Sequence, residues 1–76
     1  MEYKSTFIAE RIKEYAAQKK VSVRQVLINA GLSYNVMTAY RKSFPKADNL
    51  AKIADVLDCS VDYLLGRTDN PDSHKG

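Results

Sequence analysis

The stretch V-S-V-R-Q-V-L-I-N-A-G-L-S-Y-N-V-M-T-A-Y-R, residues 21–41, predicts two short helices joined by a tight turn. Ser22 and Ser33 stand where N-cap residues belong, because a serine hydroxyl can accept a free N–H of the first helical turn. Gln25, three residues after Ser22, completes the pattern of a capping box. Gly31 follows the first helix, where a left-handed residue can end it without a steric penalty. Two capped helices around a glycine turn predict a helix-turn-helix.

Apolar spacing along the rest of the chain predicts an all-α domain without strands. The expected helices cover residues 7–19, 23–29, 34–42, 47–57 and 61–65. We expect Thr6 to cap the first helix and Ser60 to cap the last, which Gly66 ends. Pro45 separates the third helix from the fourth, because a proline disfavours helical backbone at the residue before it. The clearest apolar stripe lies in the fourth helix and consists of Leu50, Ile53, Ala54 and Leu57.

Charge is distributed unevenly along the 76 residues, whose formal net charge is +3. Residues 48–76 contain six aspartates and three cations. Residues 15–47 contain no acid and six cations, namely Lys19, Lys20, Arg24, Arg41, Lys42 and Lys46. This basic half coincides with the predicted helix-turn-helix, as expected of a surface that binds phosphates. Surface lysines can also serve solubility alone, but so long a window without an acid favours a polyanionic partner.

Other features restrict the class of protein. The single cysteine, Cys59, allows no internal disulfide, and its apolar position predicts a buried thiol. No apolar run is long enough to cross a membrane and the first residues lack the core of a secretory signal, so we expect a cytoplasmic protein that associates with the nucleoid. The only histidine is His74, and no residue spacing suits a metal. We therefore expect no catalytic residue, no metal, no cofactor and no small-molecule ligand.

Over roughly residues 7–68 the chain resembles the phage-repressor or Cro-type (XRE) helix-turn-helix domains. That family runs S-x-x-x-L-x-x-x-x-G-[LIV]-S, then a second helix, then P-x-x-x-x-L-x-K-I-A-x-x-L-x-[VC]-S-V-D-x-L-L. The first motif is matched by Ser22 and by G-L-S at residues 31–33, and the more specific second part by K-I-A-D-V-L-D-C-S-V-D-Y-L-L-G-R-T at residues 52–68. The resemblance implies a five-helix, lambda-repressor-like DNA-binding domain over residues 1–68, with its helix-turn-helix at residues 22–42. Residues 69–76 are then a flexible polar tail.

In a helix-turn-helix the second helix lies in the major groove, and its outward residues meet the base edges. Asn35 is the strongest candidate, because asparagine can bond to the N6 and N7 edge of adenine. The complete set of base-contact candidates is Tyr34, Asn35, Thr38 and Ala39. Candidates for phosphate contacts flank this helix and are Ser22, Arg24, Ser33, Arg41, Lys42 and Lys46. We expect Tyr15 and Tyr40, which lie on apolar stripes, to belong to the core.

Two departures from the family pattern bear on DNA docking. Many members carry a glutamine directly after the first cap, where it holds a phosphate, and this chain has Val23 there. The loop R-K-S-F-P at residues 41–45 lacks the usual glycine and is one residue shorter than the family pattern. Phe44 then either fills the core or stands exposed as part of a contact surface.

These observations predict a sequence-specific, duplex-DNA-binding transcriptional regulator, a repressor of the Cro or mobile-element type. A single module of this kind buries only about 600–1,000 Å² on DNA, which favours a homodimer on a two-fold operator. The apolar candidates for the dimer surface are Tyr3, Phe7 and Tyr63.

The alternative is a protein-interaction module, an antirepressor or an antitoxin-like partner, with weak or no specific DNA binding. Val23 and the altered loop favour it. RNA binding ranks last, because we expect no exposed aromatic residues among the basic ones.

Overall fold

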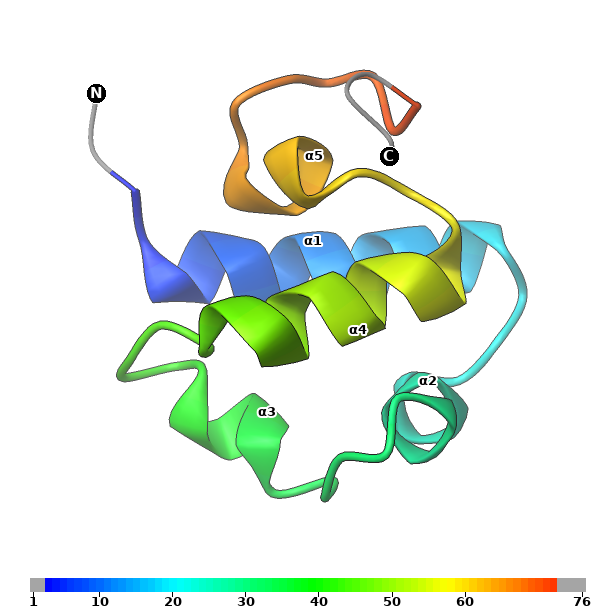
Figure 1. Ribbon diagram of the computed structural model, residues 1–76, viewed down its shortest axis with the longest axis vertical. Helices are drawn as coiled ribbons and strands as arrows, with labels where there is room; N and C mark the ends of the chain where they lie inside the picture. Colours follow the sequence, from blue (N-terminus) through cyan, green and yellow to red (C-terminus); the bar gives the residue numbers. More distant parts are fainter. Residues whose placement is uncertain (1–2, 73–76) are drawn as a thin grey trace.

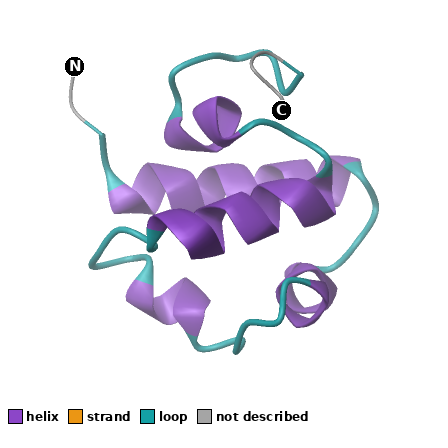
Figure 2. Ribbon diagram, in the orientation of Figure 1, coloured by secondary structure: helices purple, strands orange, loops and turns teal. Residues whose placement is uncertain are grey.

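The computed structural model describes residues 3–72, which form five helices and no strand. The helices are α1 (Ser5–Gln18), α2 (Val23–Asn29), α3 (Val36–Ala39), α4 (Ala47–Leu57) and α5 (Val61–Leu65). The two longest helices are α1 and α4. Both α2 and α5 pack against this pair, and they lie on different sides of it (Figure 1). The connections between helices are loops and turns (Figure 2). The all-α prediction is confirmed, and α2, α4 and α5 have the predicted bounds.

One hydrophobic core runs through all five helices. The predicted stripe of α4 is buried along its whole length. Tyr15 is also buried, and its ring meets the ring of Tyr63 edge to face at 5.1 Å between centroids. Tyr63 is only 4% exposed, so the expectation that it belongs to a dimer surface is wrong. Its ring turns inward because α5 packs against α1 at this point.

Serines cap two of the helices as predicted. The Ser22 hydroxyl accepts the Gln25 N–H at 3.0 Å, and the Ser60 hydroxyl accepts the Tyr63 N–H at 3.0 Å. The reciprocal half of the predicted capping box is not formed. The Gln25 side chain donates to Asn29 Oδ1 at 2.8 Å, because residues four apart are neighbours on the exposed side of a helix.

The beginning of α1 differs from the prediction. Lys4 precedes the helix with an extended φ of −121°, and the Ile8 N–H donates to its carbonyl at 3.3 Å. Ser5 is buried at the head of the stripe that includes Ile8, whereas Thr6 is exposed within the helix. Thr6 is therefore not the cap. Packing of this stripe against the core outweighs the local preference for a threonine cap.

Residues 67–72 fold back over α5. The Arg67 N–H donates to the Asp62 carbonyl at 2.9 Å, and the Pro71 carbonyl accepts the Ser60 N–H at 2.7 Å. Residues 69–71, predicted to belong to a polar tail, thus contact the helical domain. Residues 73–76 lie outside the described part of the chain.

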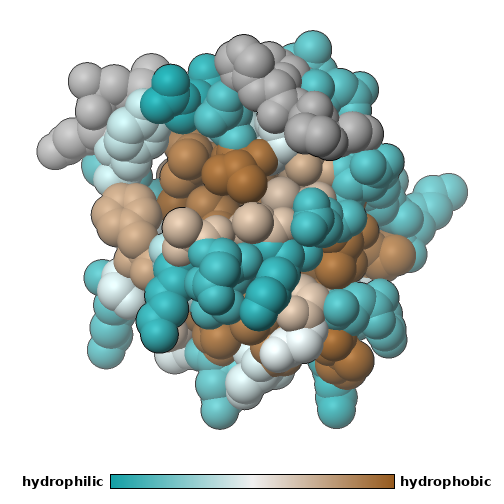
Figure 3. All heavy atoms as spheres, viewed as in Figure 1, coloured by the Kyte–Doolittle hydropathy of each residue, from teal (hydrophilic) through white to brown (hydrophobic). Residues whose placement is uncertain are grey.

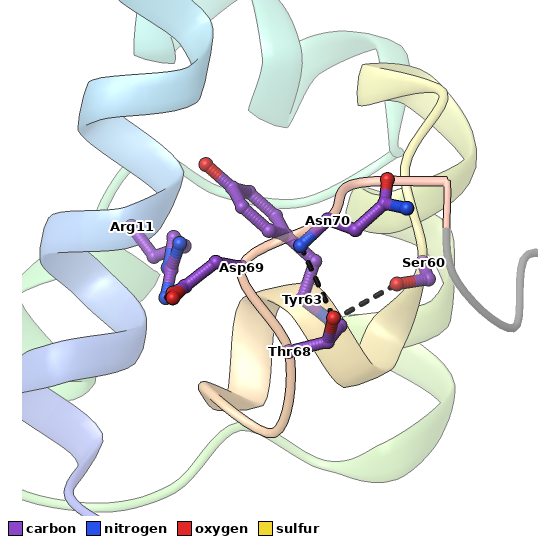
Figure 4. A network of polar contacts seen from close by, with 6 residues as sticks. All are labelled: Arg11, Ser60, Tyr63, Thr68, Asp69 and Asn70. Atoms are coloured by element: carbon purple, nitrogen blue, oxygen red, sulfur yellow. Dashed lines mark hydrogen bonds and ion pairs between the residues drawn. The ribbon is translucent and has the colours of Figure 1, made fainter.

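Arg11 connects α1 with α5 and with this C-terminal segment (Figure 4). Its guanidinium carbon lies 4.2 Å from the Tyr63 ring centroid and 4.9 Å from that of Phe7, and Nη2 lies 3.3 Å from Asp69 Oδ1. The Arg11 side chain is only 13% exposed, whereas the Asp69 side chain is fully exposed. An exposed ion pair contributes at most about 1 kcal/mol, while cation–π contacts of a desolvated cation reach about 2 kcal/mol. Stacking on the two rings therefore stabilises this cluster more than the ion pair does.

We expect Arg11→Ala to lower the free energy of unfolding by about 1–2 kcal/mol, because it removes both the stacking and the packing of the arginine stem. Asp69→Asn should lower it by less than about 0.5 kcal/mol. Urea titrations followed by circular dichroism measure both values. Equal losses in the two variants would mean that the ion pair, and not the stacking, holds this cluster together.

Two helices end at glycines in the left-handed region, with φ of 76° at Gly31 and 86° at Gly66. A Cβ added to Gly31 would meet no atom within 4 Å. A Cβ added to Gly66 would lie 2.6 Å from Cε2 of the Phe7 ring. Gly31 is therefore required for its backbone conformation alone, whereas Gly66 also allows the close approach of α1.

Replacement of each glycine by alanine separates these two effects. Gly31→Ala should cost about 1–2 kcal/mol of stability for the left-handed backbone. Gly66→Ala should cost more, because the Phe7 ring must also move. The two unfolding free energies, measured by urea titration under one set of conditions, make the comparison. A loss at Gly66 no larger than that at Gly31 would contradict the close approach of Phe7.

Candidate nucleic-acid interface

Residues 33–43, which contain the predicted base-contact residues, are wound as a short helix with tighter turns at both ends. Only Val36–Ala39 form α3, so the prediction of a helix over residues 34–42 is wrong. At both ends of α3 the backbone forms tighter turns, in which an N–H donates to the carbonyl of the third residue before it. The Met37 N–H, for example, donates to the Tyr34 carbonyl at 3.3 Å. Only Met37 and Tyr40 of this segment are buried. That is little apolar contact with which to hold further α-helical turns.

The turn between α2 and this segment follows the prediction. Gly31 has a positive φ, and the Leu32 N–H donates to the Leu27 carbonyl at 2.8 Å. The Ser33 hydroxyl accepts the Asn35 N–H at 3.2 Å, but α3 begins only at Val36, so the prediction that Ser33 is its N-cap is wrong and the hydroxyl closes the turn before the helix. Leu32 packs against the core and anchors the turn. Hydrogen bonds at Leu32 and at Ser33 thus hold the turn that precedes Asn35.

All the predicted DNA-contact residues are exposed. Met37 and Tyr40 face the core, and the base-contact candidates occupy the other side of the segment. The α2 and α3 helices form one edge of the molecule (Figure 1), and hydrophilic side chains project from that edge in Figure 3. The exposed base candidates are Tyr34, Asn35, Thr38 and Ala39, and the exposed phosphate candidates are Ser22, Arg24, Ser33, Arg41, Lys42 and Lys46.

The polar groups of this surface have capacity left for a ligand. The hydroxyls of Ser22 and Ser33 accept backbone N–H groups, so each keeps its own proton to donate to a phosphate oxygen. Within residues 3–72, the four cations of the surface form no ion pair; they are Arg24, Arg41, Lys42 and Lys46. Exposed cations beside the end of a helix-turn-helix suit the phosphates that flank a DNA groove.

Comparison with known proteins agrees with this geometry. A family model described as the Cro/C1-type HTH DNA-binding domain matches residues 11–70. The chain belongs to the Cro/C1-type helix-turn-helix family. The resemblance identified from the sequence is thus confirmed.

One relative of this Cro/C1-type domain is YobD of Bacillus subtilis (strain 168), named as an uncharacterized HTH-type transcriptional regulator. The two are 35% identical over 66 residues, which cover 83% of this chain and 58% of YobD. The chain therefore spans little more than half the length of that relative. No solved structure matches the chain.

The two departures from the family pattern have clear structural outcomes in this Cro/C1-type domain. Val23 packs against the core and offers no polar side chain to a phosphate, whereas Ser22 and Arg24 on either side of it are exposed and polar. Phe44 is 53% exposed, which decides between its two predicted positions in favour of the surface. The sequence prediction did not include it among the DNA contacts, although cations precede and follow it in the chain.

Two other kinds of site have no counterpart in the described part of the chain. Among residues 3–72, no three His, Cys, Asp or Glu side chains lie close enough to hold a metal ion. No helix in that range is long and apolar enough to cross a membrane.

Tyr40 anchors residues 33–43, called the recognition segment below, in the core of the Cro/C1-type domain. The residue is 4% exposed, and its hydroxyl makes no hydrogen bond within residues 3–72. Burial, and to a lesser extent the charge of Asp48, raises the pKa of the Tyr40 phenol above its ordinary value of 10.0. A buried hydroxyl without a partner costs about 1–3 kcal/mol. Burial of the Tyr40 ring therefore stabilises the fold, whereas burial of its unpaired hydroxyl destabilises it.

Tyr40→Phe should raise the free energy of unfolding by about 1 kcal/mol at neutral pH, because it removes the hydroxyl and keeps the ring. Since the pKa is raised by folding, the folded state holds this proton more tightly than the unfolded state. Stability is then unaffected by this group below pH 10 and falls as the pH rises through the folded pKa.

The variant should accordingly lose less stability than the wild type as the pH rises above 10, the ordinary pKa of the phenol. Urea titrations at several pH values measure the effect. Tyr34→Phe, which changes an exposed tyrosine, is the matched control and should leave stability unchanged. A Tyr40→Phe protein less stable than the wild type would show that the hydroxyl has a bonding partner in solution.

Proposed function

We propose that this Cro/C1-type domain is the DNA-reading part of a transcriptional regulator, a repressor, that binds duplex DNA sequence-specifically. One observation carries the proposal. The helix-turn-helix lies within residues 15–47, a stretch of sequence with six cations and no acid, and Arg24, Arg41, Lys42 and Lys46 of that stretch are exposed. A neutral or acidic helix-turn-helix would lack the electrostatic attraction that dominates the affinity for DNA.

In this proposal residues 33–43 enter the major groove. Asn35, at the start of the segment, reads an adenine, and Tyr34, Thr38 and Ala39 contact neighbouring base edges. Cations on both flanks bind phosphates, with Arg24 on α2 at one end and the group of Arg41, Lys42 and Lys46 at the other. Phosphate contacts set the register and orientation of the protein, and base contacts supply the specificity.

The dimensions of the domain favour two copies on one operator. Its longest extent is 28 Å, whereas half-sites one helical turn apart are separated by about 34 Å. A single copy therefore reaches one half-site only. We propose a homodimer on DNA, with Tyr3 and Phe7 as candidates for its surface because they are 39% and 40% exposed.

Two alternatives are tested by the same experiments. A protein-interaction module with this fold would bind no duplex specifically. RNA binding ranks last in the sequence prediction because no exposed aromatic residue is expected among the basic ones. That expectation is wrong, since Tyr34 is 59% exposed and Phe44 53%. The match to a DNA-binding family over residues 11–70 keeps duplex DNA as the proposal.

The test is fluorescence anisotropy of the chain with a duplex selected from a random pool, across a series of salt concentrations. Asn35→Ala should relax the preference at one base pair per half-site by about 1–3 kcal/mol. Arg24→Ala should weaken binding to all duplexes alike and reduce the salt slope by about one. Lys52→Ala removes an exposed cation from α4, outside the acid-free window, and is the control.

If no duplex is preferred over random DNA, the DNA-reading proposal is wrong and the interaction module takes its place. Tighter binding to an RNA than to any DNA duplex would instead assign the basic surface to RNA.

A further inference from the structure

Phe44 exposes more than half of a phenylalanine side chain between two charged parts of the surface. It lies in the loop between α3 and α4, where Arg41 and Lys42 precede it and Lys46 follows it, all of them exposed. Exposure of this much apolar surface is unfavourable for the isolated domain, because nothing within the described residues covers it. A contact with another molecule would remove the exposed area from water.

The loop holds Phe44 in a defined position relative to the recognition segment. The N–H and the hydroxyl of Ser43 both donate to the Ala39 carbonyl, at 2.9 and 3.3 Å. Pro45, which is partly buried, restricts the backbone on the other side, and α4 begins two residues later at Ala47. Phe44 therefore directly follows a residue that is hydrogen-bonded to Ala39, one of the base-contact candidates.

Charge distinguishes between the two partners that this loop can meet. A second copy related by a two-fold axis would bring the same patch against itself, so Arg41, Lys42 and Lys46 would face their own counterparts. Like charges at close range oppose such a contact. A DNA duplex neutralises these cations with phosphates and offers apolar sugar and base surfaces between them.

We propose that Phe44 is a further DNA contact, which packs against the sugars of the DNA backbone beside the half-site, between the phosphates that the neighbouring cations bind. This inference rests on the proposed function. Phe44 then adds an affinity that is independent of salt, because burial of an apolar side chain releases no counterions.

The experiment measures the affinity and salt slope of Phe44→Ala on the duplex selected by the wild-type chain, after circular dichroism has established that the variant is folded. The dissociation constant should rise about fivefold, the factor expected when about half of the burial energy of a phenylalanine is lost. The salt slope should not change, whereas Lys42→Ala should reduce it by about one. Ile28→Ala removes another exposed apolar side chain, 56% exposed on α2 and outside this loop, and should have no effect.

Hydroxyl-radical footprinting of the same complexes locates the contact. The wild type should protect sugars beside each half-site, and Phe44→Ala should lose that protection and keep the rest of the footprint. Wild-type binding with Phe44→Ala unchanged in affinity and footprint would overturn the inference alone. A wild-type chain that prefers no duplex would overturn the proposed function and this inference with it. If Phe44→Ala lowers the dimer fraction in sedimentation without altering the footprint, Phe44 belongs to a protein interface and the inference is wrong.

Discussion

Burial of the apolar stripes of α1 and α4 is the interaction on which the rest of the structure depends. Both α2 and α5 pack against these two helices, so the core sets the position of each. The position of α2 in turn sets that of the turn at Gly31 and of the residues after it. The recognition segment contributes only Met37 and Tyr40 to the buried side chains. Its outward residues are thus held in place by a core to which they contribute little, and they can differ without loss of the fold.

The two halves of the chain share this core but carry opposite charge. The basic half supplies α2 and the recognition segment, and the aspartates begin at Asp48, in the first turn of α4. Anions are favourable near the N-terminus of a helix, so Asp48 also has a local role. The consequence is one surface suited to phosphates, on a molecule whose net charge is only +3. In such a protein the distribution of charge says more about the partner than the total does.

Sequence reasoning succeeded where a local rule and the core required the same conformation. Ser22 and Ser60 cap helices because their hydroxyls reach an N–H three residues away, whatever lies elsewhere in the chain. It failed where packing opposed the local preference. Thr6 was expected to cap α1, but burial of Ser5 and Ile8 on one stripe extended the helix past it. The candidate DNA contacts were predicted as a set of outward residues, and their exposure agrees, although their contacts with DNA stay a prediction.

The sequence by itself determined that the chain is helical, that turns lie at Gly31, Pro45 and Gly66, and which stretch is basic, because periodicity, glycine, proline and charge act locally. Only the tertiary structure decided three further matters. Tyr63 is buried because α5 turns it onto Arg11 and α1. The recognition segment keeps a short α-helix because few of its side chains reach the core. Phe44 lies on the surface, although Tyr40, four residues earlier in the chain, is buried in the core. Each of these depends on which segments distant in sequence meet, and no local pattern contains that information.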